Sequence, residues 1–171
     1  LWSDARECVI LESQEGTVLR VFCYAGKWFV STYRLLDAQK SRWMSSESFG
    51  ARFQRGVVER ITASPASPAS QETIFKEQFL HKLDPERAYV FLLRSEASHR
   101  IVCKAPEKPC VHFLFSNAMA PKSENTISLD DATLRELFPV KQVSVDEVKQ
   151  FWKNEATDIV TRNFICGSIV C

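Results

Sequence analysis

Residues 15–53 read EGTVLRVFCYAGKWFVSTYRLLDAQKSRWMSSESFGARF and open with two short runs of β-branched and aromatic residues. The runs at 17–24 and 27–32 flank the dipeptide Ala25-Gly26. Two such runs joined by a short connection that contains glycine predict a β-hairpin. Beyond the hairpin, residues 33–43 become dense in basic, aromatic and hydroxyl side chains. The stretch therefore predicts a hairpin followed by a segment rich in basic, aromatic and hydroxyl side chains.

The rest of the chain predicts an α+β domain with a mostly antiparallel sheet and packed helices. Further strands are expected in apolar runs, at 7–13, 89–93, 100–104, 110–116 and 163–171. Helices are expected from apolar spacing or helix-start signals, at 47–61, 73–82, 129–138 and 144–154. Ser144 followed by Glu147 is a capping box. We expect one domain over residues 1–171, incomplete at one or both ends, with a flexible Ser/Pro/Ala loop at 62–71.

Composition and charge exclude several classes of protein. The 22 basic and 21 acidic residues give a net charge of +1, so only a local patch could bind nucleic acid. None of the six cysteines forms a Cys-x-x-Cys pair, which predicts free thiols in a reducing, intracellular setting and no metal site. No apolar run approaches the roughly 20 residues of a membrane span, and no signal-peptide pattern opens the sequence.

Common catalytic motifs are absent from the sequence. There is no Gly-x-Ser-x-Gly elbow, no Walker-type phosphate loop and no Gly-x-Gly-x-x-Gly. His81, His99 and His112 have no nucleophile-like neighbours, and His112 sits in an apolar run. The adjacent acids Asp130 and Asp131 precede a predicted helix, where capping explains them.

Residues 27–43 carry four cations among aromatic side chains. The cations are Lys27, Arg34, Lys40 and Arg42, and the rings are Trp28, Tyr33 and Trp43. Cations can hold phosphates while rings stack on bases, which would make this segment a nucleic-acid surface. The alternative is that the rings belong to the core and the cations are solvated at its edge. Composition alone leaves both interpretations open.

Three segments, taken in order, resemble the nucleotidyltransferase domains of RNA ligases. They are EGTVLRVF…GKWFVSTYRLLDAQKSRW…SFGARF, then YVFLLRSEASHRIV at 89–102, then FICGSIV at 164–170. The resemblance is to the divergent versions encoded by large double-stranded DNA viruses. It implies the fold of a ligase adenylation domain, in which a lysine attacks the α-phosphate of ATP with the help of Mg²⁺.

The positions that match the family's catalytic groups carry other residues. Aligned on Glu15 and Gly16, the motif lysine is replaced by Ser13. Aligned on Phe91, the glutamate of the third motif is Leu92, and the glutamate before the glycine of the fourth motif is Cys166. The resemblance therefore implies a domain without catalytic residues, which needs ATP and Mg²⁺ only if activity is retained. The residues it leaves for binding nucleotide or phosphate are Glu15, Gly16, Arg34, Lys40, Arg42 and Phe91.

We therefore expect a catalytically inactive RNA ligase-like module with a structural or interaction role and protein partners. The viral resemblance places such a module in a virion or capsid, or in a viral factory in the host cytoplasm. One alternative is a nucleic-acid-binding module that uses the basic residues. The other is an active ligase with a displaced lysine, for which Lys27 and Lys40 are the nearest candidates.

Overall fold

A computed structural model describes residues 10–11, 14–43, 45–63, 67–95, 106, 108–119, 130–144, 146–147 and 150. The chain divides into two compact units. One unit contains the short strands β1 (Ile10–Leu11) and β6 (Gln142–Val143), which pair antiparallel. The other, which we call the sheet unit, comprises Gly16–Arg100 and Lys104–Pro139 and contains every other element described below.

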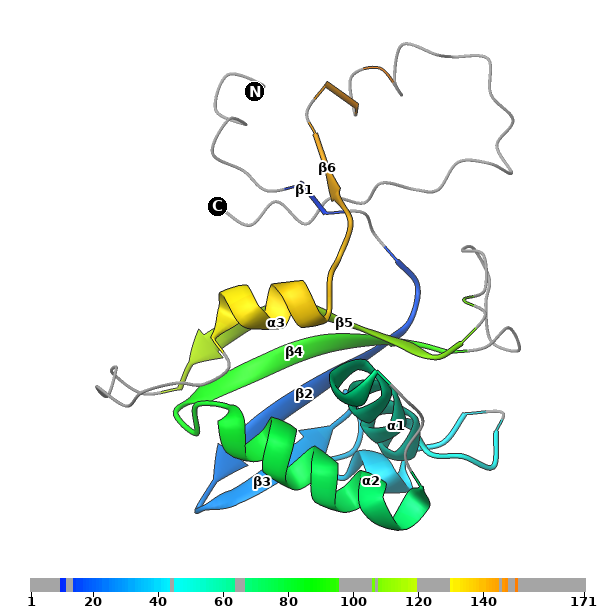
Figure 1. The fold of residues 1–171 in the computed structure, drawn as a ribbon, viewed down its shortest axis with the longest axis vertical. Helices are drawn as coiled ribbons and strands as arrows, with labels where there is room; N and C mark the ends of the chain where they lie inside the picture. The colour runs from blue at the N-terminus through cyan, green and yellow to red at the C-terminus, as the bar shows by residue number, and fades with distance from the viewer. Residues whose placement is uncertain are drawn as a thin grey trace. The chain divides into compact units, whose positions relative to one another are not determined.

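The sheet unit is built on four antiparallel strands in the order β3-β2-β4-β5 (Figure 1). They are β2 (Thr17–Tyr24), β3 (Lys27–Ser31), β4 (Arg87–Arg94) and β5 (Cys110–Ala118). The predicted hairpin is confirmed, since β2 and β3 pair from Arg20↔Ser31 to Tyr24↔Lys27. Its turn places Ala25 and Gly26 at positive φ, the conformation of the favoured tight hairpin turns. The α+β class with an antiparallel sheet is thus confirmed.

Helix α1 (Phe49–Thr62) follows the basic segment and confirms the helix predicted at 47–61. Its N-cap is Ser48, whose hydroxyl accepts a hydrogen bond from the Ala51 N–H at 3.1 Å. This bond satisfies one of the backbone donors that every helix start leaves unpaired. Ala63 ends the helix in the left-handed conformation.

The loop predicted at 62–71 is shorter than expected. Helix α2 (Pro68–Ile74) begins inside it, with Ser67 as N-cap and Pro68 in the first turn, where proline's missing N–H costs nothing. The helix continues through a π-helical turn, η3 (Phe75–Phe79), and a 3-10 turn, η4 (Leu80–Lys82). Pro68 therefore starts a helix instead of belonging to a loop, and the helix expected at 73–82 is longer than its apolar spacing predicts.

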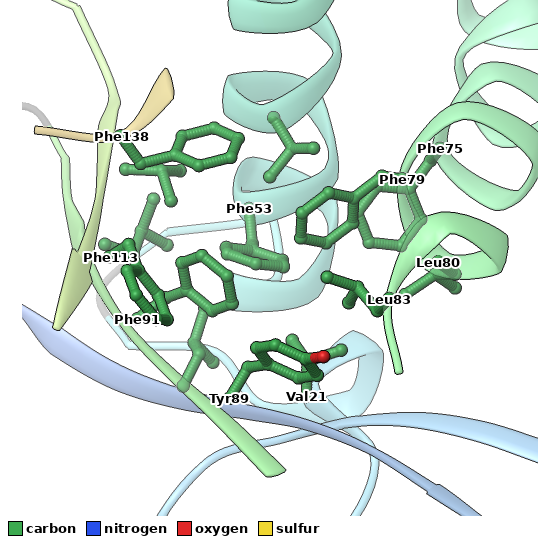
Figure 2. Close-up of a cluster of buried hydrophobic side chains, with 14 of the residues drawn as sticks. Val21, Phe53, Phe75, Phe79, Leu80, Leu83, Tyr89, Phe91, Phe113 and Phe138 are labelled. Atoms are coloured by element: carbon green, nitrogen blue, oxygen red, sulfur yellow. The ribbon is translucent and has the colours of Figure 1, made fainter. Parts of the chain in front are cut away.

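All three α-helices contribute to one core on one face of the sheet. Alternation along the strands turns Leu19, Val21, Tyr89 and Phe91 toward this face, and each is 0% exposed. Figure 2 shows the side chains that meet there, including Phe53 from α1. The other rings come from η3, β5 and the residue that ends α3 (Asp131–Leu137), namely Phe75, Phe79, Phe113 and Phe138. This aromatic cluster is the centre of the sheet unit.

Several predicted elements lie partly or wholly outside the described residues. The strands expected at 100–104 and 163–171 do so entirely, and the strand expected at 7–13 is described only at β1. The capping box is confirmed, because the Ser144 N–H donates to Glu147 Oε2 at 2.7 Å and the Glu147 N–H donates to Ser144 Oγ at 3.1 Å. The first of these bonds holds the pKa of Glu147 below its usual value.

Candidate functional site

The candidate site is the connection between β3 and α1, residues 32–43, which we call the basic loop. Its first turn is closed by hydrogen bonds from the Thr32 N–H to the Leu35 carbonyl at 2.9 Å and from the Leu35 N–H to Thr32 Oγ1 at 3.1 Å. A 3-10 turn, η2 (Ala38–Lys40), follows, and Asp37 caps it by accepting from the Gln39 N–H at 2.9 Å. The loop is therefore an ordered segment with local backbone bonds.

The second half of the basic loop is anchored on the start of α1. The Phe49 N–H donates to the Ser41 carbonyl at 2.9 Å, and Ser48 Oγ donates to Gln39 Oε1 at 3.0 Å. Gly50 allows the backbone of the basic loop to lie close to α1, because a Cβ placed on Gly50 would be only 2.7 Å from the Gln39 backbone nitrogen. Contacts this close hold the loop in one arrangement and present its side chains from a fixed base.

The outer surface of the basic loop exposes both cations and large apolar side chains. Tyr33 is 89% exposed, Leu36 60% and Trp43 58%. Arg34, Lys40 and Arg42 are also exposed; Lys40 lies 3.8 Å from Asp37, and Arg42 Nε donates to the Ser46 carbonyl at 3.0 Å. Trp28 is different, since it packs against the core. Of the two interpretations of the segment, the surface one holds for Tyr33 and Trp43 and the core one for Trp28.

The positions matched to the ligase motifs are only partly described. Ser13 and Cys166 lie outside the described residues, and Glu15 is half-buried. Gly16 lies beside Leu92 and Leu93: a Cβ on Gly16 would be 2.5 Å from the Leu93 carbonyl oxygen and 3.0 Å from a Leu92 methyl group. Phe91 and Leu92 point to opposite faces of the sheet, as neighbours in a strand must. Phe91 is 0% exposed, so this arrangement leaves no ring surface for a base.

Two polar clusters elsewhere in the sheet unit have structural explanations. Ser116 Oγ donates to Asp131 Oδ1 at 2.6 Å while the Arg87 guanidinium contacts both side chains, which ties α3 to β4 and β5. Asp130 accepts from the Thr133 N–H at 2.8 Å, which holds its pKa below the usual value and confirms the predicted cap. Burial raises the pKa of Tyr89 to about 12.

Cys110 and His112 form a pair that the sequence analysis did not identify. Their Sγ and Nε2 atoms are 3.6 Å apart, and His112 Nδ1 donates to the Pro139 carbonyl. Burial raises the pKa of the Cys110 thiol, and Arg94 only partly offsets this. A reactive cysteine needs a lowered pKa, so the pair lacks the signature of an activated nucleophile. The i, i+2 spacing in a strand was the signal that could have revealed it.

The side of the sheet opposite the helices is the second surface that the sequence analysis missed. We call it the helix-free face, because the described helices of the sheet unit pack on the other side. Strand alternation and register assign its members, which are Val18, Arg20, Phe22, Tyr24, Lys27, Phe29, Ser31, Ala88, Val90, Leu92, Arg94, Cys110, His112, Phe115 and Asn117. The signal was present in the sequence, since strands that are apolar at successive positions are apolar on both faces.

The described part of the chain contains neither a cluster of metal-ligating side chains nor a helix suited to a bilayer. No group of three or more His, Cys, Asp or Glu side chains there could hold a metal ion. No helix there is both long and apolar enough to span a bilayer. Cys23 and Cys110, the two cysteines with described surroundings, are free thiols.

These features define an α+β protein with two surfaces that are at least partly exposed, the basic loop and the helix-free face. No family model matches the chain. It is 32% identical over 111 residues to an immediate-early protein ICP-46 homolog of Invertebrate iridescent virus 3, covering 65% of this chain and 22% of the relative. A homolog of the same name from Invertebrate iridescent virus 6 is 31% identical over 157 residues, covering 88% of this chain and 34% of the relative.

A further relative is the immediate-early protein ICP-46 of Frog virus 3 (isolate Goorha). It is 25% identical over 108 residues, which cover 60% of this chain and 26% of the relative. The matched regions thus span between 22% and 34% of the length of these three relatives. The expected relation to proteins of large DNA viruses is confirmed.

Proposed function

We propose that this chain is a non-catalytic module with a ligase-like sheet, which acts by binding other macromolecules. The observation that carries the proposal is that Phe91 is buried in the core and that Leu92 has an apolar side chain. The resemblance assigns the first to nucleotide binding and the second to a catalytic glutamate. Phe91 is instead enclosed in the aromatic cluster, and Leu92 is a 7% exposed hydrocarbon side chain that cannot bind a metal ion or position a phosphate.

The spatial relation of the first and third motif positions supports the ligase-like part of the proposal. Gly16 and Leu92 are far apart in the sequence, yet a Gly16 Cβ would lie 3.0 Å from a Leu92 methyl group. The pairing Thr17↔Leu93 brings the two segments together in adjacent strands. The first and third motif positions are therefore adjacent in space, although the catalytic lysine and glutamate are missing from them. This combination fits a domain that has retained the ligase fold and lost the activity.

The test is covalent labelling with nucleotide. The chain is incubated with radiolabelled ATP or GTP and Mg²⁺, beside an RNA ligase of known activity as positive control, and proteins are separated under denaturing conditions. We expect label on the control and none on this chain, because no lysine occupies the motif position. A labelled lysine in this chain would contradict the proposal and, at Lys27 or Lys40, would establish the displaced-lysine alternative.

A second candidate function, nucleic-acid binding by the basic loop, is favoured by the exposure of its side chains. Tyr33 and Trp43 present rings to solvent at 89% and 58% exposure. Arg34, Lys40 and Arg42 are exposed in the same loop. Cations that hold the backbone and rings that stack on bases are the two requirements for binding single strands.

Changing Arg34, Lys40 and Arg42 together to alanine is expected to weaken binding of a single-stranded oligonucleotide. Each lost phosphate contact should reduce the slope of log K against log salt by about 0.7, so the slope falls by roughly 2 if all three cations contact phosphates. Fluorescence anisotropy across a salt series measures both affinity and slope. The matched control changes three exposed lysines outside the loop, Lys76, Lys82 and Lys108, with the same loss of charge. Equal losses in both variants would exclude the loop as the site.

The setting in which the module works is also a proposal. The relatives carry names of immediate-early proteins of iridescent viruses and of a frog virus, which supports action inside infected cells. The free thiols of Cys23 and Cys110 are compatible with a reducing compartment such as a viral factory. We keep a virion or capsid role as the alternative, with protein partners in either case.

A further inference from the structure

The helix-free face is apolar over much of its area. Val18 is 46% exposed and Phe115 is 38% exposed, although both belong to paired strands. In the strand between them, Leu92 pairs with Val18 and Val90 pairs with Phe115. Farther along the face, the rings of Phe22 and Phe29 stack with centroids 5.5 Å apart. Exposed apolar patches that span several elements mark interaction sites in soluble proteins.

The charged side chains among the strand residues of the helix-free face all carry positive charge. The four strands β2, β3, β4 and β5 contain no aspartate or glutamate at any position. Arg20, Lys27 and Arg94 all project from this face by the strand register. Arg20 is partly held by its bond to the Thr32 carbonyl at 3.1 Å. A partner with apolar and acidic side chains would complement both the surface and its charge.

A second copy of this chain is a poor occupant for the face. In a two-fold dimer the same surface meets itself, so the cations of one copy would approach the cations of the other. A single strand of nucleic acid is also less suitable. Phe22 and Phe29 stack on each other rather than lying open, and Val18 and Val90 have no ring on which a base could stack. Apolar sheet faces are most often covered by helices, which bury a stripe of aliphatic side chains.

We propose that the helix-free face binds an acidic amphipathic helix of a partner protein. Its apolar stripe would lie over Val18, Val90 and Phe115, with its carboxylates near Arg20 and Lys27. This inference goes beyond the proposed function, because it concerns a surface that neither the motif positions nor the basic loop includes. It stands even if the loop binds no nucleic acid.

The experiment selects binders for the 171-residue chain from a displayed library of single amphipathic helices. The apolar stripe of the library is constant, and its polar positions are randomised among Glu, Lys and Gln. We expect Glu to be enriched over Lys at the polar positions. The selected peptides should bind about tenfold more tightly than their Lys counterparts, since Arg20 and Lys27 are exposed on the face. Reversing both charges with Arg20→Glu and Lys27→Glu should make the Lys counterparts the tighter binders.

Two further variants locate the binding site. Val18→Ser with Phe115→Ser should weaken the selected peptides tenfold or more, whereas Tyr33→Ser with Leu36→Ser, which removes exposed apolar groups from the basic loop, should bind them as the unmodified chain does. Circular dichroism and thermal unfolding check that each variant is folded. Should the face variant not fold, cross-linking of a photoreactive selected peptide to the unmodified chain replaces it, and labelled residues must lie in β2 to β5.

Three results would overturn the proposal. The first is a selection that yields no helix above background or favours Lys. The second is that the selected peptides lose affinity for the loop variant and keep their affinity for the face variant. The third is a labelled oligouridine that binds through Phe22 and Phe115 when no helix does, in which case the face binds single-stranded nucleic acid.

Discussion

Replacing Phe91 with alanine is expected to lower the free energy of unfolding by about 3–5 kcal/mol. The Phe91 side chain is 0% exposed and lies at the centre of the aromatic cluster. Its ring centroid is 5.4 to 5.8 Å from four other rings, those of Phe53, Phe79, Phe113 and Phe138. Removing it loses the buried apolar area and leaves a cavity lined by these four rings, which come from α1, η3, β5 and the end of α3. Since a domain of this size has a stability of roughly 5–15 kcal/mol, much of it would be lost.

Chemical denaturation followed by circular dichroism measures the effect. The matched control is Phe115→Ala, because Phe115 belongs to the adjacent strand β5 but faces the opposite side and is 38% exposed. Its loss should cost only the cross-strand contribution, about 0.2–1 kcal/mol. Equal losses in the two variants would contradict the assignment of Phe91 to the core. A stable Phe91→Ala variant with altered nucleotide binding would instead return Phe91 to the binding role that the ligase resemblance implied.

Gly50→Ala is expected to destabilise the sheet unit by about 1–3 kcal/mol through overpacking. Gly50 lies in the first turn of α1, and alanine is a better helix former than glycine, so helix propensity does not account for the expected loss. The reason is the close docking of the basic loop on α1. A Cβ at position 50 would lie 2.7 Å from the Gln39 nitrogen and 2.9 Å from the Ala38 carbonyl carbon, and backbone atoms cannot rotate out of the way.

Gly56→Ala is the control within the same helix. Its Cβ would lie 3.0 Å from a Val111 methyl group, which can shift by a small side-chain adjustment. Helix propensity and this milder contact then offset each other, and we expect a change within about 1 kcal/mol. Denaturation compares the two variants, and amide hydrogen exchange over residues 37–43 reports whether the loop has moved. Equal stability of the two variants, with unchanged exchange in the loop, would show that the loop is not anchored through Gly50.

Local patterns predicted the elements of the sheet unit well. Alternation and a glycine turn predicted the β2–β3 hairpin, and apolar spacing predicted α1 and the η3 and η4 turns that continue α2. The Ser144/Glu147 capping box and the Asp130 cap were read correctly because capping depends on residues a few positions apart. The loop predicted at 62–71 extends too far. Proline breaks a helix when it lies in the interior, but it is well tolerated in the first turn, which is where Pro68 lies.

The candidate site was predictable in composition but not in its arrangement. Trp28, Tyr33 and Trp43 looked alike in the sequence, yet Trp28 packs on the core while the others are exposed. The difference follows from which strand face or loop position each occupies after the sheet has formed. The helix-free face was not predicted, because its members come from four strands whose pairing order the sequence does not state.

Sequence alone established the α+β class, the hairpin, the Asp130 and Ser144/Glu147 caps and the lack of a lysine before Glu15 and Gly16. These depend on neighbouring residues, whose geometry local sterics and hydrogen bonds control. Only the tertiary structure decided that Phe91 belongs to the core, that Gly16 lies against Leu92 and that the basic loop is anchored by Gly50. These contacts join segments far apart in the chain, and they form because burial of apolar area, which is non-directional, selects among many pairings that local patterns equally allow.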